Sequence, residues 1–209
     1  MARKVSPTRI ALLNLKKELK VAKKGHKLLK DKRDGLIKTF MRVIYEARDK
    51  RRQVETELGG AFASYLRARS LTPAQQMDAA MLLPNTKIDL SVMVRNVMSV
   101  PVPEFTLEKT GHAFSYSLTD TTADLDRSML AFDTAIIHIL ELAALEKSAE
   151  NLAVEIERTR RRVSALENIM IPELQSTIKF VAQQLEERAR DAVVSTMRVK
   201  AMIVANEKV

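Results

Sequence analysis

The sequence of 209 residues contains no cysteine and no tryptophan, only 5 glycines, and 4% aromatic residues. Without cysteine the chain can form neither disulfides nor zinc–thiolate sites, and it has no thiolate nucleophile. The glycines form neither a phosphate-binding P-loop nor a dinucleotide-binding fingerprint, and no Ser or Lys stands next to a recognisable base. His26, His112 and His138 are scattered, without acidic neighbours at metal-ligand spacing. We therefore expect no catalytic residue, no cofactor and no metal.

Long uncharged apolar runs are also missing. No run approaches the ~18 uncharged apolar residues of a membrane span, and the first residues lack the apolar core of a signal peptide. With 46% hydrophobic residues the chain nevertheless has enough apolar side chains to fold. We expect a soluble, cytoplasmic protein that does not insert into a membrane.

The positive charge is concentrated at one end of the sequence. The net charge is +9, and residues 1–60 hold 18 Lys and Arg against 7 Asp and Glu, whereas residues 61–209 hold 17 against 19. Such a polarised charge implies a negatively charged partner, which could be nucleic acid, anionic lipid or an acidic protein surface.

The first long stretch has the apolar spacing of a coiled-coil helix. After a helix-start signal at Ser6-Pro7-Thr8, seam positions alternate by three and four residues from Leu12 to Leu71. Four seam positions are polar or charged, a feature that fixes register at a cost in stability: His26, Arg33, Lys50 and Glu57. Gly59-Gly60 lies inside this helix at a cost of about 1 kcal/mol per glycine relative to alanine. The pair indicates either a bend or the close approach of another chain.

The second long stretch begins at a cap signal, Thr121–Asp124, and continues almost to the C-terminus, over roughly 80 residues. Its clearest seam lies between Leu152 and Met170, where the steps are 4, 3, 4, 3 and 4. Pro172 has no N–H to donate to the helix, so we expect a kink there and a stutter in the seam.

Residues 72–121 separate the two stretches and have a different pattern. Thr72 and Gln75 have the spacing of a capping box and predict a short helix as far as Leu83. Alternation of apolar and polar residues then predicts two short strands, one at 88–94 and one at 112–118.

These patterns predict a fold dominated by α-helices: a long antiparallel two-helix coiled coil with a small insert of a short helix and a β-hairpin at the turn end. The expected divisions are 1–71 for the N-terminal long helix, 72–121 for the insert and 122–209 for the C-terminal long helix. Both termini would lie at one electropositive tip.

Two segments, 6–36 and 155–185, resemble the D subunit of the V-type and A-type rotary ATPases, and residues 84–120 match that family only loosely. The segments share the family's Pro-Thr-Arg, Lys-Gly-His-Lys, Arg-Arg-Arg-Val and Ile-Pro motifs in the expected order. The motif residues are Pro7, Gly25, His26, Arg160, Arg161, Arg162, Leu166 and Pro172.

The resemblance implies a non-catalytic central-stalk rotor axle of a rotary ATPase or ATP synthase. The axle would couple ATP hydrolysis or synthesis in the hexamer of A and B subunits to translocation of H⁺ or Na⁺ across the membrane. The implied partners are the F, A and B subunits and the subunit that caps the membrane ring. The chain would be cytoplasmic and peripheral to the membrane as part of the complex.

Two sets of residues are predicted to bind these partners. The set expected to face the hexamer socket is Arg3, Lys4, Arg9, Lys16, Lys20, Lys23 and Lys24. The set expected to bind other central-stalk subunits is Ile88, Leu90, Val92, Val94, Val97, Met98 and Val100. The alternative function is a stand-alone basic coiled coil that binds nucleic acid, although the basic stretch lacks interleaved stacking aromatics before Phe40. A third function, an adaptor on anionic lipid, lacks the bulky aromatic face that such helices use.

Overall fold

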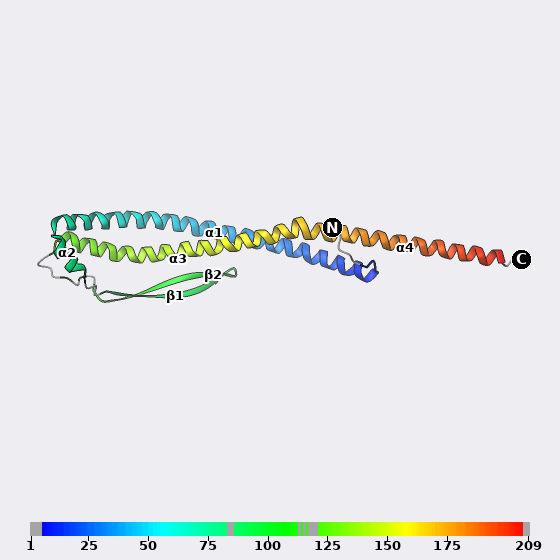
Figure 1. The fold of residues 1–209 in the computed structure, drawn as a ribbon, viewed down its shortest axis with the longest axis horizontal. Helices are drawn as coiled ribbons and strands as arrows, with labels where there is room; N and C mark the ends of the chain where they lie inside the picture. Colours follow the sequence, from blue (N-terminus) through cyan, green and yellow to red (C-terminus); the bar gives the residue numbers. More distant parts are fainter. Residues whose placement is uncertain (1–5, 83–85, 113, 115, 117–120, 207–209) are drawn as a thin grey trace. The chain divides into compact units, whose positions relative to one another are not determined.

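The computed structural model describes residues 6–82, 86–112, 114, 116 and 121–206. The elements in chain order are α1 (Arg9–Leu71), α2 (Ala74–Met81), β1 (Lys87–Val97), β2 (Val100–Thr110), α3 (Ala123–Ala165), the π-helical turn η1 (Leu166–Met170) and α4 (Ile171–Asn206) (Figure 1). Long helices with a short helix and a two-stranded antiparallel hairpin between them confirm the predicted fold class.

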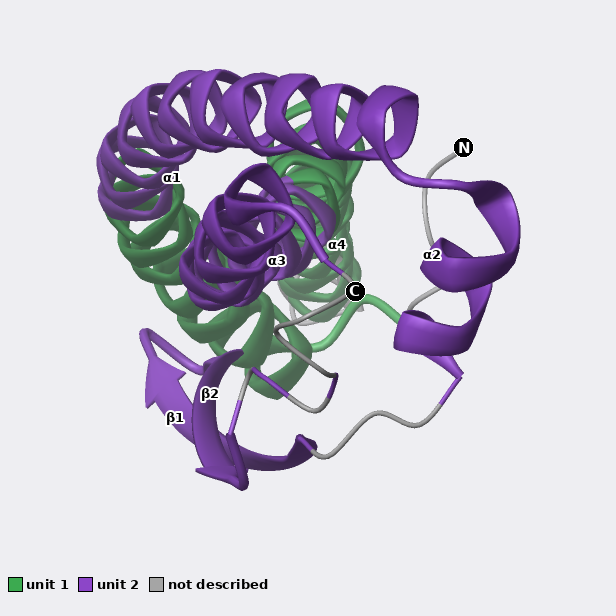
Figure 2. Cartoon of the chain, turned by 90° about the vertical axis from the view of Figure 1, so that its left-hand side faces the viewer, with its two compact units in different colours: residues 1–34, 157–209 green, residues 35–156 purple. Residues whose placement is uncertain are grey.

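By its internal contacts the chain forms two units, which we describe separately (Figure 2). Unit 1 contains residues 1–34 and 157–209, and unit 2 contains residues 35–156. Each unit therefore takes segments from both long helices. The division of the chain into residues 1–71, 72–121 and 122–209 remains a prediction.

In unit 2 the second part of α1 packs antiparallel against α3. Higher residue numbers on α1 lie opposite lower numbers on α3, because Leu36 packs with Leu152 whereas Ala68 packs with Leu125. The first of these clusters also contains Val100 from the hairpin, and the second contains Met77 from α2. The hairpin and α2 thus share the apolar core of the helix pair.

In unit 1 the first part of α1 packs on α4. The core is a short ladder of Leu15 and Ala22 from α1 with Leu174 and Val181 from α4. The buried seam of this unit also includes hydroxyl residues, and Thr177 satisfies its hydroxyl by donating to the carbonyl of Glu173 at 2.8 Å. Such a narrow seam, one side chain wide, is typical of a two-stranded coiled coil.

The helix starts differ from the predicted caps. Thr8 caps α1, because its Oγ1 accepts a hydrogen bond from the Ala11 N–H at 3.1 Å, so the cap lies two residues after Ser6. The predicted capping box at Thr72 does not form: α2 begins after Pro73 without a side-chain cap, and no described group bonds the Thr72 hydroxyl. The short helix ends at Met81 rather than at Leu83, which lies outside the described residues.

The first predicted strand lies within β1, but the second was placed wrongly. Residues 113, 115, 117 and 118 lie outside the described residues, and the described residues at 112, 114 and 116 are not in a strand. The partner of β1 is instead β2, joined to it by the two-residue turn Met98-Ser99, whose φ angles are 53° and 69°. Both residues are left-handed, as a type I′ hairpin turn requires.

The prolines of β2 explain the error. Pro101 and Pro103 made this segment unfavourable as a strand. In the register, however, they lie opposite Asn96 and Val94, at positions whose backbone nitrogen points away from β1. Neither proline therefore costs the hairpin an interstrand hydrogen bond.

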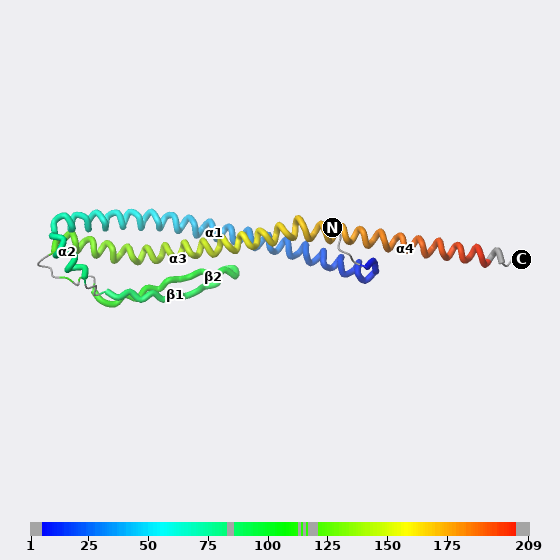
Figure 3. The backbone as a smooth tube through the Cα atoms, viewed as in Figure 1, coloured from blue at the N-terminus to red at the C-terminus, as the bar shows by residue number. Residues whose placement is uncertain are grey.

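The helix changes type locally just before Pro172, where a kink is predicted. Five residues before α4 form the π-helical turn η1, and the N–H of Ile171 bonds the carbonyl of Leu166 at the i→i−5 spacing. Pro172 follows as the second residue of α4. The wider turn accommodates the proline, so the helix continues from α3 through η1 into α4 (Figure 3).

This continuous helix contains one notably apolar window. Between Ala123 and Ile203, 18 residues have a mean hydropathy of 1.6, enough by length and composition to cross a membrane, and 11% of the window is buried. The apolar part of α3, residues 129–145, nevertheless carries Asp133, His138 and Glu141, each paired with a side chain of unit 2. These pairs belong to a helix packed on protein.

Candidate partner-binding surfaces

The predicted basic residues of unit 1 lie on one exposed side of α1. Steps of seven, four and three residues from Arg9 through Lys16 and Lys20 to Lys23 keep these side chains on a common face, with Lys24 beside it. All five are exposed, and among the described residues no carboxylate forms an ion pair with them. Arg3 and Lys4 lie outside the described residues. We call the group from Arg9 to Lys24 the basic face.

The C-terminal part of α4 extends past its partner helix. The Arg188 guanidinium donates to the carbonyl of Pro7 at 2.9 Å, so residue 188 lies at the start of α1. The next 18 residues of α4 continue for about 27 Å without a partner in the described part of unit 1. The large apolar side chains there are exposed, including Val199 and Met202.

We call residues 189–203 the α4 overhang. Its large exposed apolar side chains are Val193, Val194, Met197, Val199, Met202 and Ile203. Isolated exposed apolar residues are ordinary, but six within eleven positions of one helix form a surface that a partner would cover. We predicted that both termini lie at one tip, but α4 continues past the start of α1.

The three consecutive arginines of the motif are exposed near η1. Arg161 forms an ion pair with Glu157 on its own helix, and Arg160 and Arg161 border a shallow groove of about 630 Å³. The other residues lining the groove are Glu157, Ser164, Ala165, Asn168 and Ile169. A groove made by one helix around a π-turn is open to a partner, since no second described element lines it.

Four further motif residues lie in unit 1. His26 Nε2 lies 3.5 Å from Glu167 Oε2 but makes no hydrogen bond among the described groups. Leu166 begins η1, Pro172 follows it, and Gly25 has no heavy atom within 4 Å of the position that a Cβ would occupy.

The hairpin residues that are predicted to bind partners differ in their exposure to solvent. The side chains of Ile88, Leu90, Val92 and Val94 on β1 are 41–67% exposed, whereas Val97 is half-buried. Val100 departs from the prediction, because it is 1% exposed and packs with Leu36 and Leu152. A side chain enclosed in this way has no surface for a partner.

The tip of the hairpin is fixed to both long helices of unit 2. Met98 Cε lies 2.9 Å from the position where a Cβ would sit on Gly35, so only glycine leaves room for this contact without a shift. The Asn151 side-chain amide donates to the carbonyl of Pro101 at 2.9 Å. No sequence pattern indicates this attachment, and the Met98 side chain belongs to it as much as to the surface.

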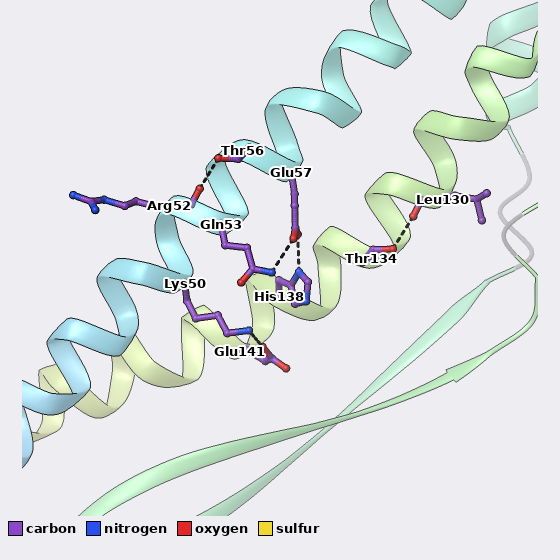
Figure 4. Close-up of polar contacts among 9 residues, drawn as sticks. All are labelled: Lys50, Arg52, Gln53, Thr56, Glu57, Leu130, Thr134, His138 and Glu141. Atoms are coloured by element: carbon purple, nitrogen blue, oxygen red, sulfur yellow. Dashed lines mark hydrogen bonds and ion pairs between the residues drawn. The ribbon is translucent and has the colours of Figure 1, made fainter.

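A polar layer lies in the seam between α1 and α3 (Figure 4). Glu57 Oε2 is 2.6 Å from His138 Nδ1, and Gln53 donates to the other carboxylate oxygen of Glu57 at 2.9 Å. One turn away, Lys50 donates to Glu141 at 2.7 Å. The hydrogen bonds from His138 and Gln53 lower the pKa of Glu57 from its ordinary value, because they favour the carboxylate.

The described residues expose surfaces of four kinds. Within the described residues, no group of three or more His, Asp or Glu side chains is placed to hold a metal ion. Two of the predicted polar seam positions, Lys50 and Glu57, are paired across the helices with Glu141 and His138. What remains accessible is a basic face, an apolar overhang, an arginine-lined groove and an exposed strand.

The comparisons with known proteins agree along nearly the whole chain. A family model described as the D subunit of ATP synthase matches residues 11–201. The V-type ATP synthase D subunit of Thermoanaerobacter sp. (strain X514) is 41% identical over 202 residues, covering 96% of this chain and 97% of the relative. The protein of the same name from Clostridioides difficile is 42% identical over 203 residues, covering 96% and 91%. The one from Fusobacterium nucleatum is 41% identical over 203 residues, covering 96% of both.

Proposed function

The chain belongs to the D-subunit family of ATP synthases, and from this membership we propose that it is the central-stalk rotor axle of a V/A-type rotary ATPase. As a D subunit it works within a membrane-associated complex with other rotary ATPase subunits. The observation that carries the proposal is the match to a V-type ATP synthase D subunit over 96% of the chain. The axle couples ATP hydrolysis or synthesis in the A/B hexamer to movement of H⁺ or Na⁺.

Unit 1 supplies the end of the axle that enters the hexamer. Its basic face and the α4 overhang are exposed, and in the described residues they have no partner within the chain. A basic surface can turn inside an acidic sleeve without one fixed contact, because exposed ion pairs are individually weak and only weakly directional. The apolar overhang adds contact area that a sleeve of protein can cover.

Unit 2 supplies the end that binds the F subunit and the subunit capping the membrane ring. Its surface includes the exposed strand β1 and apolar side chains of α3 such as Leu130 and Ile137. These residues would be covered in the assembled stalk, which accounts for an apolar helix that is buried over so little of its length.

The chain itself is non-catalytic in this proposal. ATP turns over at the interfaces of the A and B subunits, and the axle transmits torque through its packed helices. The protein is cytoplasmic and attached to the membrane only through the complex. The nucleic-acid alternative has no support from the relatives, which are named as D subunits of V-type ATP synthases.

A tagged full-length chain purified from gently solubilised native membranes tests the proposal. Co-purification of the A, B and F subunits in fixed ratios, with ATPase activity in the eluate and none in the isolated chain, is the expected result. Recovery of nucleic acid without ATPase subunits would refute it.

The basic face is tested by a triple variant, Lys16→Gln, Lys20→Gln and Lys23→Gln, in the assembled complex. Loss of three exposed ion contacts of roughly 0.5 kcal/mol each lowers the affinity for the hexamer about tenfold. The matched control neutralises three exposed cations of the same helix in unit 2: Lys38→Gln, Arg42→Gln and Arg52→Gln. Equal effects of the two triple variants on hexamer binding would remove the basic face from the proposal.

A further inference from the structure

The two edges of the hairpin in unit 2 are not equivalent. The edge of β2 faces α3 and is closed by it: Asn151 bonds the carbonyl of Pro101, and Lys109 pairs with Asp133 (Figures 1 and 2). From Pro101 to Lys109 the strand spans about 26 Å, and from Asn151 back to Asp133 the helix spans about 27 Å. β2 therefore runs along α3, and its prolines remove two N–H groups from that edge.

The register defines the opposite edge, on β1. Val97 and Val100 flank a two-residue turn and form a hydrogen-bonded pair. Alternate residues of β1 back to Lys87 therefore bond β2, and the residues between them direct their N–H and C=O groups away from β2. The outward-directed residues are Ile88, Leu90, Val92, Val94 and Asn96. No described residue pairs with this edge.

The β1 edge has no proline and no bulge, and its charged residues, Lys87, Asp89 and Arg95, lie at the positions that bond β2 rather than at the outward-directed ones. Natural edge strands are protected by proline, by a bulge, or by charged side chains at the edge. The four outward residues from Ile88 to Val94 are apolar and exposed, and the pairing with β2 is regular over all eleven residues. The same hairpin has two prolines at the equivalent positions of β2, so the protection is confined to the edge that α3 already covers.

The hairpin also has a face that carries charged residues, and these indicate which kind of segment fits beside β1. Asp89 lies directly opposite Glu108 in the register, and like charges placed opposite each other destabilise a sheet. A cationic residue on a third strand beside Asp89 would relieve this repulsion. Alternate apolar residues on that strand would continue the row formed by Ile88, Leu90, Val92 and Val94.

We infer that the free edge of β1 binds an extended segment of another subunit of the complex, which pairs with it as a third strand. The segment alternates apolar residues with polar ones and places Lys or Arg beside Asp89. The inference rests on the proposed docking role of unit 2 and specifies its mode, which is main-chain pairing rather than contact through side chains alone.

Residue-resolved amide hydrogen exchange tests the pairing mode directly. In the isolated chain the amides of Ser91, Met93 and Arg95 are protected by β2, whereas those of Leu90, Val92 and Val94 exchange freely. In the assembled complex the second set becomes protected as well. Unchanged rapid exchange of these three amides after assembly would overturn the inference. Protection that appears in the isolated chain on raising its concentration would also overturn it, because the occupant would then be a second copy.

A proline substitution on the outward side separates strand pairing from side-chain docking. Val92→Pro removes an outward N–H and leaves the bonds to β2 intact, as Pro103 does on the other strand. We expect this variant to lower the retention of the subunits bound to unit 2 about tenfold. The matched control, Val92→Thr, keeps the N–H and the preference for a strand, so this variant retains the bound subunits. Equal retention by the two variants would overturn the strand pairing.

A third variant distinguishes failure of this inference from failure of the proposed function. Residues 88–109 are replaced by a short Gly-Ser linker in the full chain. If the replacement releases the bound subunits and Val92→Pro does not, docking by the hairpin stands and main-chain pairing fails. If the replacement leaves the binding of these subunits unchanged, both the proposed docking role of the hairpin and the inference fail.

Discussion

Unit 1 and unit 2 pair segments of the same long helices by different means. In unit 2, α1 and α3 are linked by several polar contacts, among them Lys50 with Glu141, Arg51 with Glu146 and Glu57 with His138. In the described part of unit 1, the contacts of this kind include His26 with Glu167 and Arg188 with the Pro7 carbonyl. Unit 2 also buries the hairpin tip and α2, whereas unit 1 has its apolar ladder alone.

The two units therefore differ in what their charged residues do. In unit 2 they fix the register of two helices, and in unit 1 they form an exposed surface. Paired polar groups across a seam hold two helices at one relative position, because any shift leaves charges unpaired. A seam of small and apolar residues holds them less specifically. Unit 1 keeps most of its charge on the outside, where it can bind an acidic partner, and unit 2 uses charge inside to fix α1 against α3.

Core substitutions should show the largest difference in stability between the two units. Leu152→Ala removes a side chain enclosed by α1 and by the hairpin, and should lower the free energy of unfolding by about 2–5 kcal/mol. Leu174→Ala in unit 1 should cost less, about 2 kcal/mol, because the narrower seam lets neighbours and water fill the space. Urea unfolding followed by far-UV circular dichroism measures both losses. A larger loss for Leu174→Ala would reverse the comparison.

The glycines of α1 give a smaller effect of opposite sign. Neither Gly59 nor Gly60 has a heavy atom within 4 Å of the position that a Cβ would take, so alanine at either site should raise stability by about 1 kcal/mol. Gly35→Ala should gain less, because the end of the Met98 side chain must move away.

The same substitutions separate the two explanations of the Gly59-Gly60 pair. If another chain approaches closely there, the Gly59→Ala and Gly60→Ala proteins are more stable alone yet assemble poorly. If the pair only permits a bend, assembly is unaffected. Thermal unfolding of the isolated chain, beside the yield of assembled complex, measures the two quantities.

The polar layer of unit 2 should make its stability depend on pH. The pKa of Glu57 is lower in the folded chain than its ordinary value of 4.5, chiefly because His138 and Gln53 bond the carboxylate. The folded state therefore holds fewer protons than the unfolded one in this range, and the contribution is present above about pH 4.5 and is lost as the pH falls through the folded pKa.

The Glu57→Gln variant isolates this contribution. It should be less stable than the parent chain at about pH 7, and the difference should shrink as the pH falls through the folded pKa and Glu57 becomes protonated. The midpoint of urea unfolding at each pH measures it, with Glu141→Gln as a control for the neighbouring pair. A difference that grows on acidification would contradict the assigned role of Glu57.

The smallest expected effect is that of an exposed ion pair in unit 1. Arg161→Ala removes a contact with Glu157 on the same helix, and should change the free energy of unfolding by less than about 0.5 kcal/mol. Urea unfolding provides the measurement. A loss above about 1 kcal/mol would mean that the arginine run stabilises unit 1, contrary to its place on an exposed groove.

Local patterns were sufficient for most of the fold. The three-and-four spacing from Leu12 to Leu71 predicted α1, and the alternation from Ile88 to Val94 predicted β1. The alternation at 112–118 predicted a strand, but the described residues 112, 114 and 116 are not in one, and β2 satisfies the pairing of β1 despite its prolines. Alternation alone cannot identify the partner of a strand, since pairing depends on the turn and on which edge each N–H faces.

Of the candidate surfaces, the sequence located the basic face but not the α4 overhang. The seam pattern continues to Met202, and only the position of Arg188 beside Pro7 shows that α1 has already ended. Similarly, Val100 alternates like its neighbours in sequence, and only the packing of the hairpin tip on Leu36 and Leu152 removes it from the surface. Motif residues such as Arg160 were recognised without any knowledge of the groove that they line.

The sequence by itself determined the helices, the charged end of the chain and the family, because helical periodicity, net charge and motif order are properties of residues close together along the chain. Tertiary structure alone decided where the paired helices stop and which edge of the hairpin stays open. Each of these depends on a contact between residues far apart in sequence, and such contacts are set by the relative lengths and register of elements that local patterns do not encode.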